Sequence, residues 1–172
     1  CRFRSRWRHT RADSIGLFDV WFVRWPRQTL QAEGYHLSMK CGLPRRLEAV
    51  AAQVLPGKPM ADIGTDHAQL PLALVRMGTV PSAIALDIVE GPIEIARRAT
   101  AAFRDRIDVR RSDGFEGLKA KEAASVCVCG MGGRTMAGIL QRGHAVWAGS
   151  ERLILQPQGM ADEVRTVMLE HG

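Results

Sequence analysis

Residues 61–71 read ADIGTDHAQLP, and this run carries the strongest structural signal in the 172-residue chain. Asp62 ends a short apolar segment, Gly64 follows two positions later, and Asp66 comes two positions after that. A helical pattern of apolar residues then begins, at Leu70, Leu74 and Met77. A strand, a tight glycine turn and a helix start are the parts of a nucleotide-type cofactor site. Gly64 lets the backbone approach a ligand closely, because no Cβ stands in the way.

The charges in this run indicate a ligand without phosphate groups. The three-glycine fingerprint of dinucleotide-binding sites is absent, and carboxylates would face the place where a pyrophosphate lies. Asp62 and Asp66 beside Gly64 suit a cationic ligand better. S-adenosylmethionine is the common cofactor of that kind, and we expect it to bind here.

Helical and strand-like segments alternate from residue 44 onward. The apolar runs predict strands at 59–63, 83–87, 107–110, 125–129 and 153–155. The apolar periodicity predicts helices at 44–55, 66–77, 91–103, from the 130–133 turn to about 141, and 161–170. This alternation is typical of an α/β domain around a mostly parallel, buried sheet. No apolar stretch is long enough to span a bilayer.

Acidic residues stand at the carboxyl ends of the strands, where ligands bind in open α/β sheets. Asp87 comes 25 positions after Asp62, close to the spacing of an acid that binds ribose hydroxyls. The alternative for Asp87 is a surface turn aspartate. Asp113, followed by Gly114, is a candidate acceptor for the amino group of the cofactor's adenine, or else part of an ordinary Asp-Gly turn.

Five ordered motifs together resemble one family. They are ADIGTDHAQLP (61–71), ALD followed by GP (85–92), RSDGF (111–115), CGMGG (129–133) and LILQP (153–157). Residues 42–172 resemble bacterial tRNA (adenine-22, N1)-methyltransferases, which are class I enzymes that depend on S-adenosylmethionine. The resemblance implies a Rossmann-like class I methyltransferase fold and tRNA as the partner. Without a long apolar stretch or a metal-binding spacing in the sequence, we expect no membrane and no metal as partners. It also implies transfer of a methyl group to N1 of an adenosine in the D-arm region.

Family proteins carry further strands and a C-terminal helical domain that this sequence lacks. We therefore expect a C-terminally truncated fold with one exposed sheet edge, which is an aggregation hazard. We also expect this chain to bind the cofactor weakly and to methylate poorly.

Methylation at N1 places a positive charge on the base, which a nearby carboxylate stabilises. Asp66 is our candidate for this catalytic role, because it follows the cofactor turn and precedes the helix. Its alternative role is the N-cap of that helix, and the two roles can coexist. His67 is a candidate substrate contact, or else a surface group. Gln156 and Pro157 line the base pocket or simply end the fifth strand.

A glycine-rich turn follows the fourth strand, where methyltransferases that modify amino groups often carry an Asn/Asp-Pro-Pro-aromatic turn. This turn has no acceptor side chain, whereas a ring nitrogen offers its lone pair directly and has only to be positioned. Gly132 and Gly133 allow close approach of a base, or a tight turn from strand to helix. The candidate substrate-binding residues of the turn are Gly130, Met131, Gly132 and Gly133.

The net charge of +6 does not establish RNA binding. Residues 1–38 account for +4 of it, and the remaining 134 residues for +2. The four cysteines have no metal-binding spacing, and Cys127 and Cys129 point to the same side of a strand as small core residues. No secretory signal is present, so we expect a cytoplasmic protein.

Residues 1–38 do not follow the strand and helix pattern. They hold three of the four tryptophans and seven arginines, without sustained periodicity, and Met39 stands just before the family match. Our hypothesis is that 1–38 is a disordered or non-native extension. Residues 39–172 then form an incomplete S-adenosylmethionine-binding methyltransferase domain.

Other functions stay open. One is a class I methyltransferase with another substrate, since cofactor motifs outnumber substrate motifs. Another is a non-catalytic RNA- or cofactor-binding module that has kept the fold and lost the activity. An NAD-dependent oxidoreductase fits less well, because Gly64 stands alone where three glycines are needed.

Overall fold

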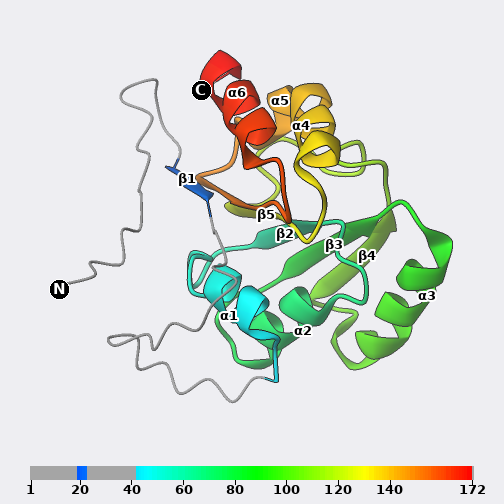
Figure 1. The fold of residues 1–172 in the computed structure, drawn as a ribbon. Coiled ribbons are helices and arrows are strands. Elements are labelled where there is room, and N and C mark those ends of the chain that lie inside the picture. Colours follow the sequence, from blue (N-terminus) through cyan, green and yellow to red (C-terminus); the bar gives the residue numbers. More distant parts are fainter. Residues whose placement is uncertain (1–18, 23–41, 172) are drawn as a thin grey trace, which may run out of the picture.

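A computed structural model describes residues 19–22 and 42–171. In these residues a six-stranded sheet lies between two layers of helices (Figure 1). Its strands are β1 (Asp19–Phe22), β2 (Met60–Ile63), β3 (Ala83–Asp87), β4 (Ile107–Arg111), β5 (Ser125–Cys129) and β6 (Arg152–Gln156). Its helices are α1 (Arg45–Ala51), α2 (Gln69–Arg76), α3 (Glu90–Ala99), the 3₁₀ turn η1 (Ala101–Phe103), α4 (Gly133–Arg142), α5 (His144–Trp147) and α6 (Ala161–His171).

The sheet has the order β1-β6-β5-β2-β3-β4, and each of its paired strands is parallel. From β2 the chain builds outward through β3 to β4, and it then returns to the other side of β2 to form β5 and β6. The carboxyl ends of β2 and β5 therefore lie at the point where the order of winding reverses. Ligands bind at such points in open α/β sheets, because the loops from the two neighbouring strands diverge there.

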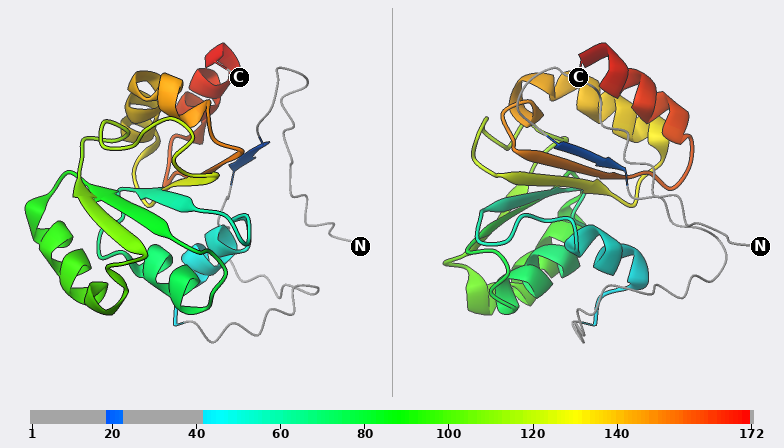
Figure 2. Two further views of the ribbon diagram at one scale, coloured as in Figure 1. Left: turned by 180° about the vertical axis from the view of Figure 1, so that it is seen from behind. Right: turned by 90° about the vertical axis from the view of Figure 1, so that its left-hand side faces the viewer.

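Strands β2, β3, β5 and β6 are largely buried on both faces, as expected from their apolar runs, whereas β4 at the edge of the sheet is partly exposed. One core joins the sheet to α4, α5 and α6, and it includes Ile63, Val128, Met136 and Trp147. The other core lies under α1 and α2, and it includes Met60, Val50, Leu74, Cys127 and Cys129. Figure 2 shows these helix groups on opposite sides of the sheet. The prediction that Cys127 and Cys129 are small core residues is confirmed, because both are buried.

The predicted strands from 59 onward and the major helices are present, with shifts of a few residues at their ends. The helix predicted at 44–55 ends at Ala51, and the helix expected from residue 66 begins at Gln69 instead. Asp66 (φ 56°) and Ala68 (φ 55°) adopt left-handed conformations, which a right-handed helix excludes. Ala68 is the residue before the helix, so the alternative role of Asp66 as its N-cap is wrong.

The expectation of an exposed edge beside β6 is wrong for the residues described. β1 pairs with β6 along four positions, from Asp19 opposite Arg152 to Phe22 opposite Leu155. Residues 19–22 of the predicted 1–38 extension thus form a strand of the sheet, and the rest of that segment lies outside the described residues. The backbone groups on the outer side of β6 need partners, and the short run DVWF supplies them. None of the helices described is long and apolar enough to cross a membrane.

Candidate functional site

Asp62 is the buried acid at the centre of the candidate site. It stands near the carboxyl end of β2 with 5% of its surface exposed, and its Oδ2 accepts a hydrogen bond from Thr65 Oγ1 at 2.8 Å. Burial raises the pKa of Asp62 from 3.8 to about 7. The Thr65 hydrogen bond and the charge of Arg46 act in the opposite direction, and the neighbouring Asp87 raises the pKa further. Asp62 is therefore an acid whose charge changes near neutral pH.

Gly64 forms the tight turn that follows β2. Its φ is +72°, and its N–H donates to the carbonyl of Leu86 at 2.8 Å, so the turn is held against β3. A Cβ at this position would lie 2.8 Å from Cε of Met131. The side chain of Met131 thus rests on the bare backbone of Gly64. The structure brings the two turns predicted to bind cofactor and substrate into contact.

Asp87 connects the turns after β2 and β3. Its Oδ2 accepts from the N–H of Asp66 at 3.0 Å, and its Oδ1 accepts from the N–H of Val89 at 3.0 Å. A carboxylate oxygen has two lone pairs, so each oxygen retains the capacity for one further donor. Asp87 is half-buried at the end of β3, and its carboxylate is close enough to Asp62 to raise the pKa of that acid.

Asp113 and Gly114 lie in the turn after β4, next to Asp87. The N–H of Ser112 donates to the carbonyl of Asp87 at 2.8 Å, which fixes the two strand ends side by side. Gly114 has a φ of +58°, and a Cβ there would lie 2.8 Å from Cγ2 of Ile139. The carboxylate of Asp113 forms an ion pair with Arg142 Nη2 at 3.0 Å.

The glycine-rich turn after β5 completes the site on its other side. The N–H of Gly130 donates both to the backbone carbonyl of Gln156 at 3.1 Å and to its Oε1 at 3.2 Å. Gln156 is buried at the end of β6, and Pro157 follows it, half-buried. A Cβ at Gly130 would lie 3.3 Å from Nη1 of Arg46, so the guanidinium of α1 covers this strand end.

Gly132 and Gly133 are neighbours with different reasons to be glycine. A Cβ at Gly133 would lie 2.1 Å from the carbonyl oxygen of Met160, because the loop after β6 crosses directly over it. The N–H of Gly133 donates to the carbonyl of Gly159 at 2.9 Å. A Cβ at Gly132 would meet no described atom within 4 Å, and its φ of −65° suits any residue. Gly133 is therefore required by packing, whereas Gly132 leaves open space beside the site.

Asp66 and His67 lie at the mouth of the site. The side chain of Asp66 is 64% exposed, and its Oδ1 is 3.5 Å from Nε2 of His67, which is 42% exposed. Because its N–H is tied to Asp87, Asp66 holds an exposed carboxylate at a fixed backbone position.

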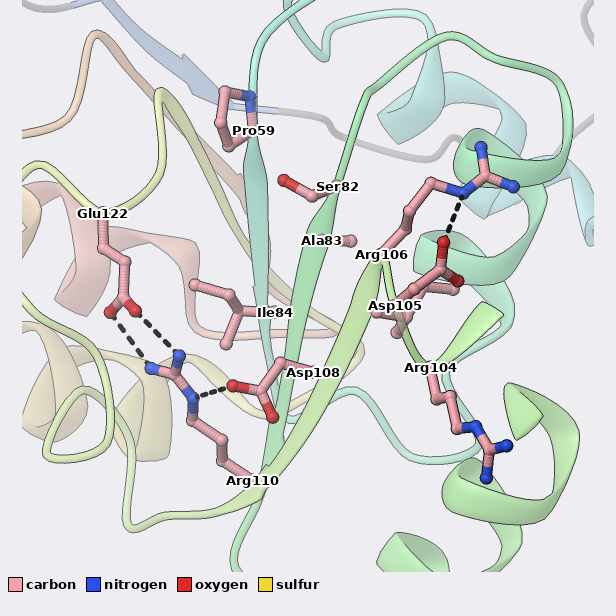
Figure 3. Close-up of a pocket in the computed structure, with 11 residues that line it drawn as sticks. Pro59, Ser82, Ala83, Ile84, Arg104, Asp105, Arg106, Asp108, Arg110 and Glu122 are labelled. Atoms are coloured by element: carbon pink, nitrogen blue, oxygen red, sulfur yellow. Dashed lines mark hydrogen bonds and ion pairs between the residues drawn. The ribbon is translucent and has the colours of Figure 1, made fainter. Parts of the chain in front are cut away.

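A hollow of about 260 Å³ lies at the amino ends of β2, β3 and β4, away from the predicted site residues. Figure 3 shows the side chains that line it. Arg110 is its central cation, and Glu122 and Asp108 bind it at 2.7 Å each. Its guanidinium also donates to the carbonyl of Gly117 at 2.7 Å. This arginine is neutralised by its neighbours and joins β4 to the loop before β5, which is a structural role. In 19–22 and 42–171 no group of three or more His, Cys, Asp or Glu residues is arranged to hold a metal ion.

The structure adds two arginines to the site that were not predicted from the sequence. Arg46 reaches the site from α1, where its guanidinium lies beside Gly130 and its charge lowers the pKa of Asp62. Arg142 reaches Asp113 from the last turn of α4, 29 residues further along the chain. No local pattern in the sequence predicts either contact, because each depends on how a helix packs across the sheet.

Comparison with known proteins gives consistent results. The family model described as a methyltransferase domain matches residues 43–172. Among curated proteins, the chain is similar to the tRNA (adenine(22)-N(1))-methyltransferase of Bacillus subtilis (strain 168), with 42% identity over 125 residues. This match covers 72% of the chain and 52% of the relative, so the chain spans about half the length of that relative.

Solved structures share both sequence and fold with the chain. The B. subtilis M1A22 tRNA methyltransferase TrmK has a TM-score of 0.72 and 40% identity, over 74% of this chain and 56% of that one. M. capricolum TrmK in complex with S-adenosyl-homocysteine has a TM-score of 0.66 and 32% identity, over 75% and 58%. The predicted Rossmann-like class I methyltransferase fold is confirmed.

Proposed function

Because the chain belongs to the methyltransferase domain family, we propose that it acts in the transfer of a methyl group from S-adenosylmethionine to N1 of adenosine 22 in tRNA. The observation that carries the proposal is the meeting of Asp62, Gly64 and Asp87 at the point where the winding of the sheet reverses. Similarity to the B. subtilis and M. capricolum enzymes supports the choice of reaction and substrate. Since tRNA is the substrate, the proposal places the protein in the cytoplasm.

The residues present fit S-adenosylmethionine chemically. Asp87 has acceptor capacity left on both oxygens for ribose hydroxyls, and Asp113 uses Oδ1 for Arg142, which leaves Oδ2 for an amino group. Gly64 exposes backbone once the flexible side chain of Met131 turns away from it. The bound cofactor would supply an electrophilic methyl group on a sulfonium, and Asp62 would supply a buried acid close to that cation.

On the substrate side, the chain has to position a ring nitrogen and stabilise the charge that forms. The turn from Gly130 to Gly133 carries no acceptor side chain, which suits a nucleophile that has no proton to lose. The base would occupy the open space beside Gly132. We assign His67, Met131, Gln156 and Pro157 to the residues that surround the bound base. Asp66 presents an exposed carboxylate at the mouth, where it would stabilise the positive charge of the methylated base.

The test separates cofactor binding from methyl transfer. Binding of S-adenosylhomocysteine to the chain is measured by calorimetry. The chain is then incubated with S-adenosylmethionine and unmodified bacterial tRNA, and nucleosides are analysed by mass spectrometry. We expect 1-methyladenosine, and we expect it to disappear when adenosine 22 is replaced by guanosine.

Two outcomes would contradict the proposal in different ways. Binding without methylation of any tRNA would indicate another substrate or a non-catalytic module. Methylation that persists on the adenosine 22 variant would keep the enzyme class and refute the position.

A further inference from the structure

The ion pair between Arg142 and Asp113 joins the last turn of α4 to the turn after β4. Nη2 of Arg142 is 3.0 Å from Oδ1 of Asp113. One helical turn earlier on α4, Ile139 packs against Gly114, where a Cβ would lie only 2.8 Å from Cγ2. An apolar contact and an ion pair therefore fix the Asp113 turn to one face of the same helix.

Helix α4 also reaches the other half of the site. It begins at Gly133, directly after the proposed base-binding turn, and ends at Arg142. Its ten residues span about 15 Å, so a single rigid element contacts the substrate side with one end and the Asp113 turn with the other.

We propose that Arg142 is a positioning residue for recognition of the cofactor's adenine. It holds Asp113 through Oδ1 and so directs Oδ2 toward the 6-amino group of the ligand. This inference rests on the proposed function, because it takes S-adenosylmethionine as the ligand. Arg142 does not contact the ligand in this account, and it acts through the orientation of the Asp113 carboxylate.

The exposure of the two side chains sets the expected size of the effect. Arg142 is 58% exposed and Asp113 is 44% exposed, so the pair contributes little to folding stability. Its contribution to binding comes from orienting the carboxylate before the ligand arrives. A charge-assisted hydrogen bond from the amino group to Asp113 favours the adenine ligand by about tenfold or more. Loss of the orientation reduces this preference to about threefold, because the carboxylate then has to be ordered on binding.

The experiment measures a ratio of two dissociation constants by calorimetry, using the full chain. The first ligand is S-adenosylhomocysteine, and the second is its purine analogue with hydrogen in place of the 6-amino group. The variants are Arg142→Ala and Arg142→Lys. The control is Lys58→Ala. It removes the ion pair between Lys58, in the loop before β2, and Glu151, whose side chains are about as exposed as those of Arg142 and Asp113.

We expect the unaltered chain and the Lys58→Ala control to prefer the adenine ligand by the same factor. Arg142→Ala should bring the ratio close to threefold, and Arg142→Lys should restore part of it. An unchanged ratio in Arg142→Ala, or an equal loss of affinity for both ligands, would overturn the proposal. The second result would mean that Arg142 contacts the ligand directly, for example by stacking on the ring. Failure of the unaltered chain to bind either ligand would instead overturn the proposed function, and this inference with it.

Discussion

Replacing Asp62 with asparagine is expected to change how the stability of the protein depends on pH. Burial raises the pKa of Asp62 from 3.8 to about 7 in the folded protein. In the unfolded chain the carboxyl is exposed to water and titrates near its ordinary value. Between about pH 4 and pH 7 the folded state therefore keeps a proton that the unfolded state has released. The free energy of unfolding of the unaltered protein falls as the pH rises through this window, and the contribution of Asp62 is constant above it.

The size of the effect follows from the difference between the two pKa values. Each unit of pKa difference corresponds to 1.36 kcal/mol, so a rise from 3.8 to about 7 corresponds to at most about 4 kcal/mol. Asparagine has no proton to release, and its carbonyl oxygen can still accept the hydrogen bond from Thr65. The variant should therefore gain stability relative to the unaltered protein as the pH rises from 4 to 8.

The assay is urea denaturation followed by circular dichroism at pH 4, 5.5, 7 and 8.5. The quantity to compare is the free energy of unfolding of Asp62→Asn minus that of the unaltered protein. Asp105→Asn is the control, because it removes a carboxylate that is 75% exposed. A difference in the free energy of unfolding that stays constant from pH 4 to pH 8.5 would contradict a raised pKa of Asp62. A difference that falls with pH would show that Asp62 is stabilised as an anion, with Arg46 outweighing burial.

Four further substitutions test the site. Gly133→Ala should destabilise the protein by about 3 kcal/mol or more in thermal denaturation, because its Cβ would lie 2.1 Å from the carbonyl oxygen of Met160. Gly132→Ala should leave the melting temperature unchanged while lowering tRNA methylation, and equal destabilisation by both alanines would contradict our account of this turn. Asp66→Asn keeps a residue that tolerates the left-handed conformation, so the variant should fold like the unaltered protein. Its dissociation constant for S-adenosylhomocysteine should stay within twofold of that of the unaltered protein. Methylation should fall at least tenfold, and full activity of this variant would refute the catalytic role. Asp87→Ala should weaken S-adenosylhomocysteine binding by about tenfold or more in calorimetry, since it removes a carboxylate from the site; unchanged affinity would exclude a role in binding ribose.

Much of the architecture was predictable from local patterns. The apolar runs identified β2, β3, β5 and β6, because strands buried on both faces need continuous apolar residues. β4 was also predicted, although Ile107 is its one buried residue. The same order of strands and helices placed Asp62, Asp87 and Asp113 at the carboxyl ends of neighbouring strands, since parallel strands all end on the same side of the sheet. The short helix α5 was not predicted, because four residues are too few to show a periodicity. The start of α2 was misplaced, because a left-handed residue such as Ala68 leaves no signal in the sequence.

Local sequence patterns specify the alternation of strands and helices, and with it the carboxyl end of the sheet where the candidate site residues gather. These properties depend on neighbours a few positions apart, and the order of residue types records them. Which side chains meet there depends on the three-dimensional fold. The pairing of β1 with β6, the reach of Arg46 to Gly130 and the ion pair of Arg142 with Asp113 join residues far apart in the chain. Such contacts depend on the pairing of distant strands and on the packing of helices across the sheet, and no local periodicity encodes either.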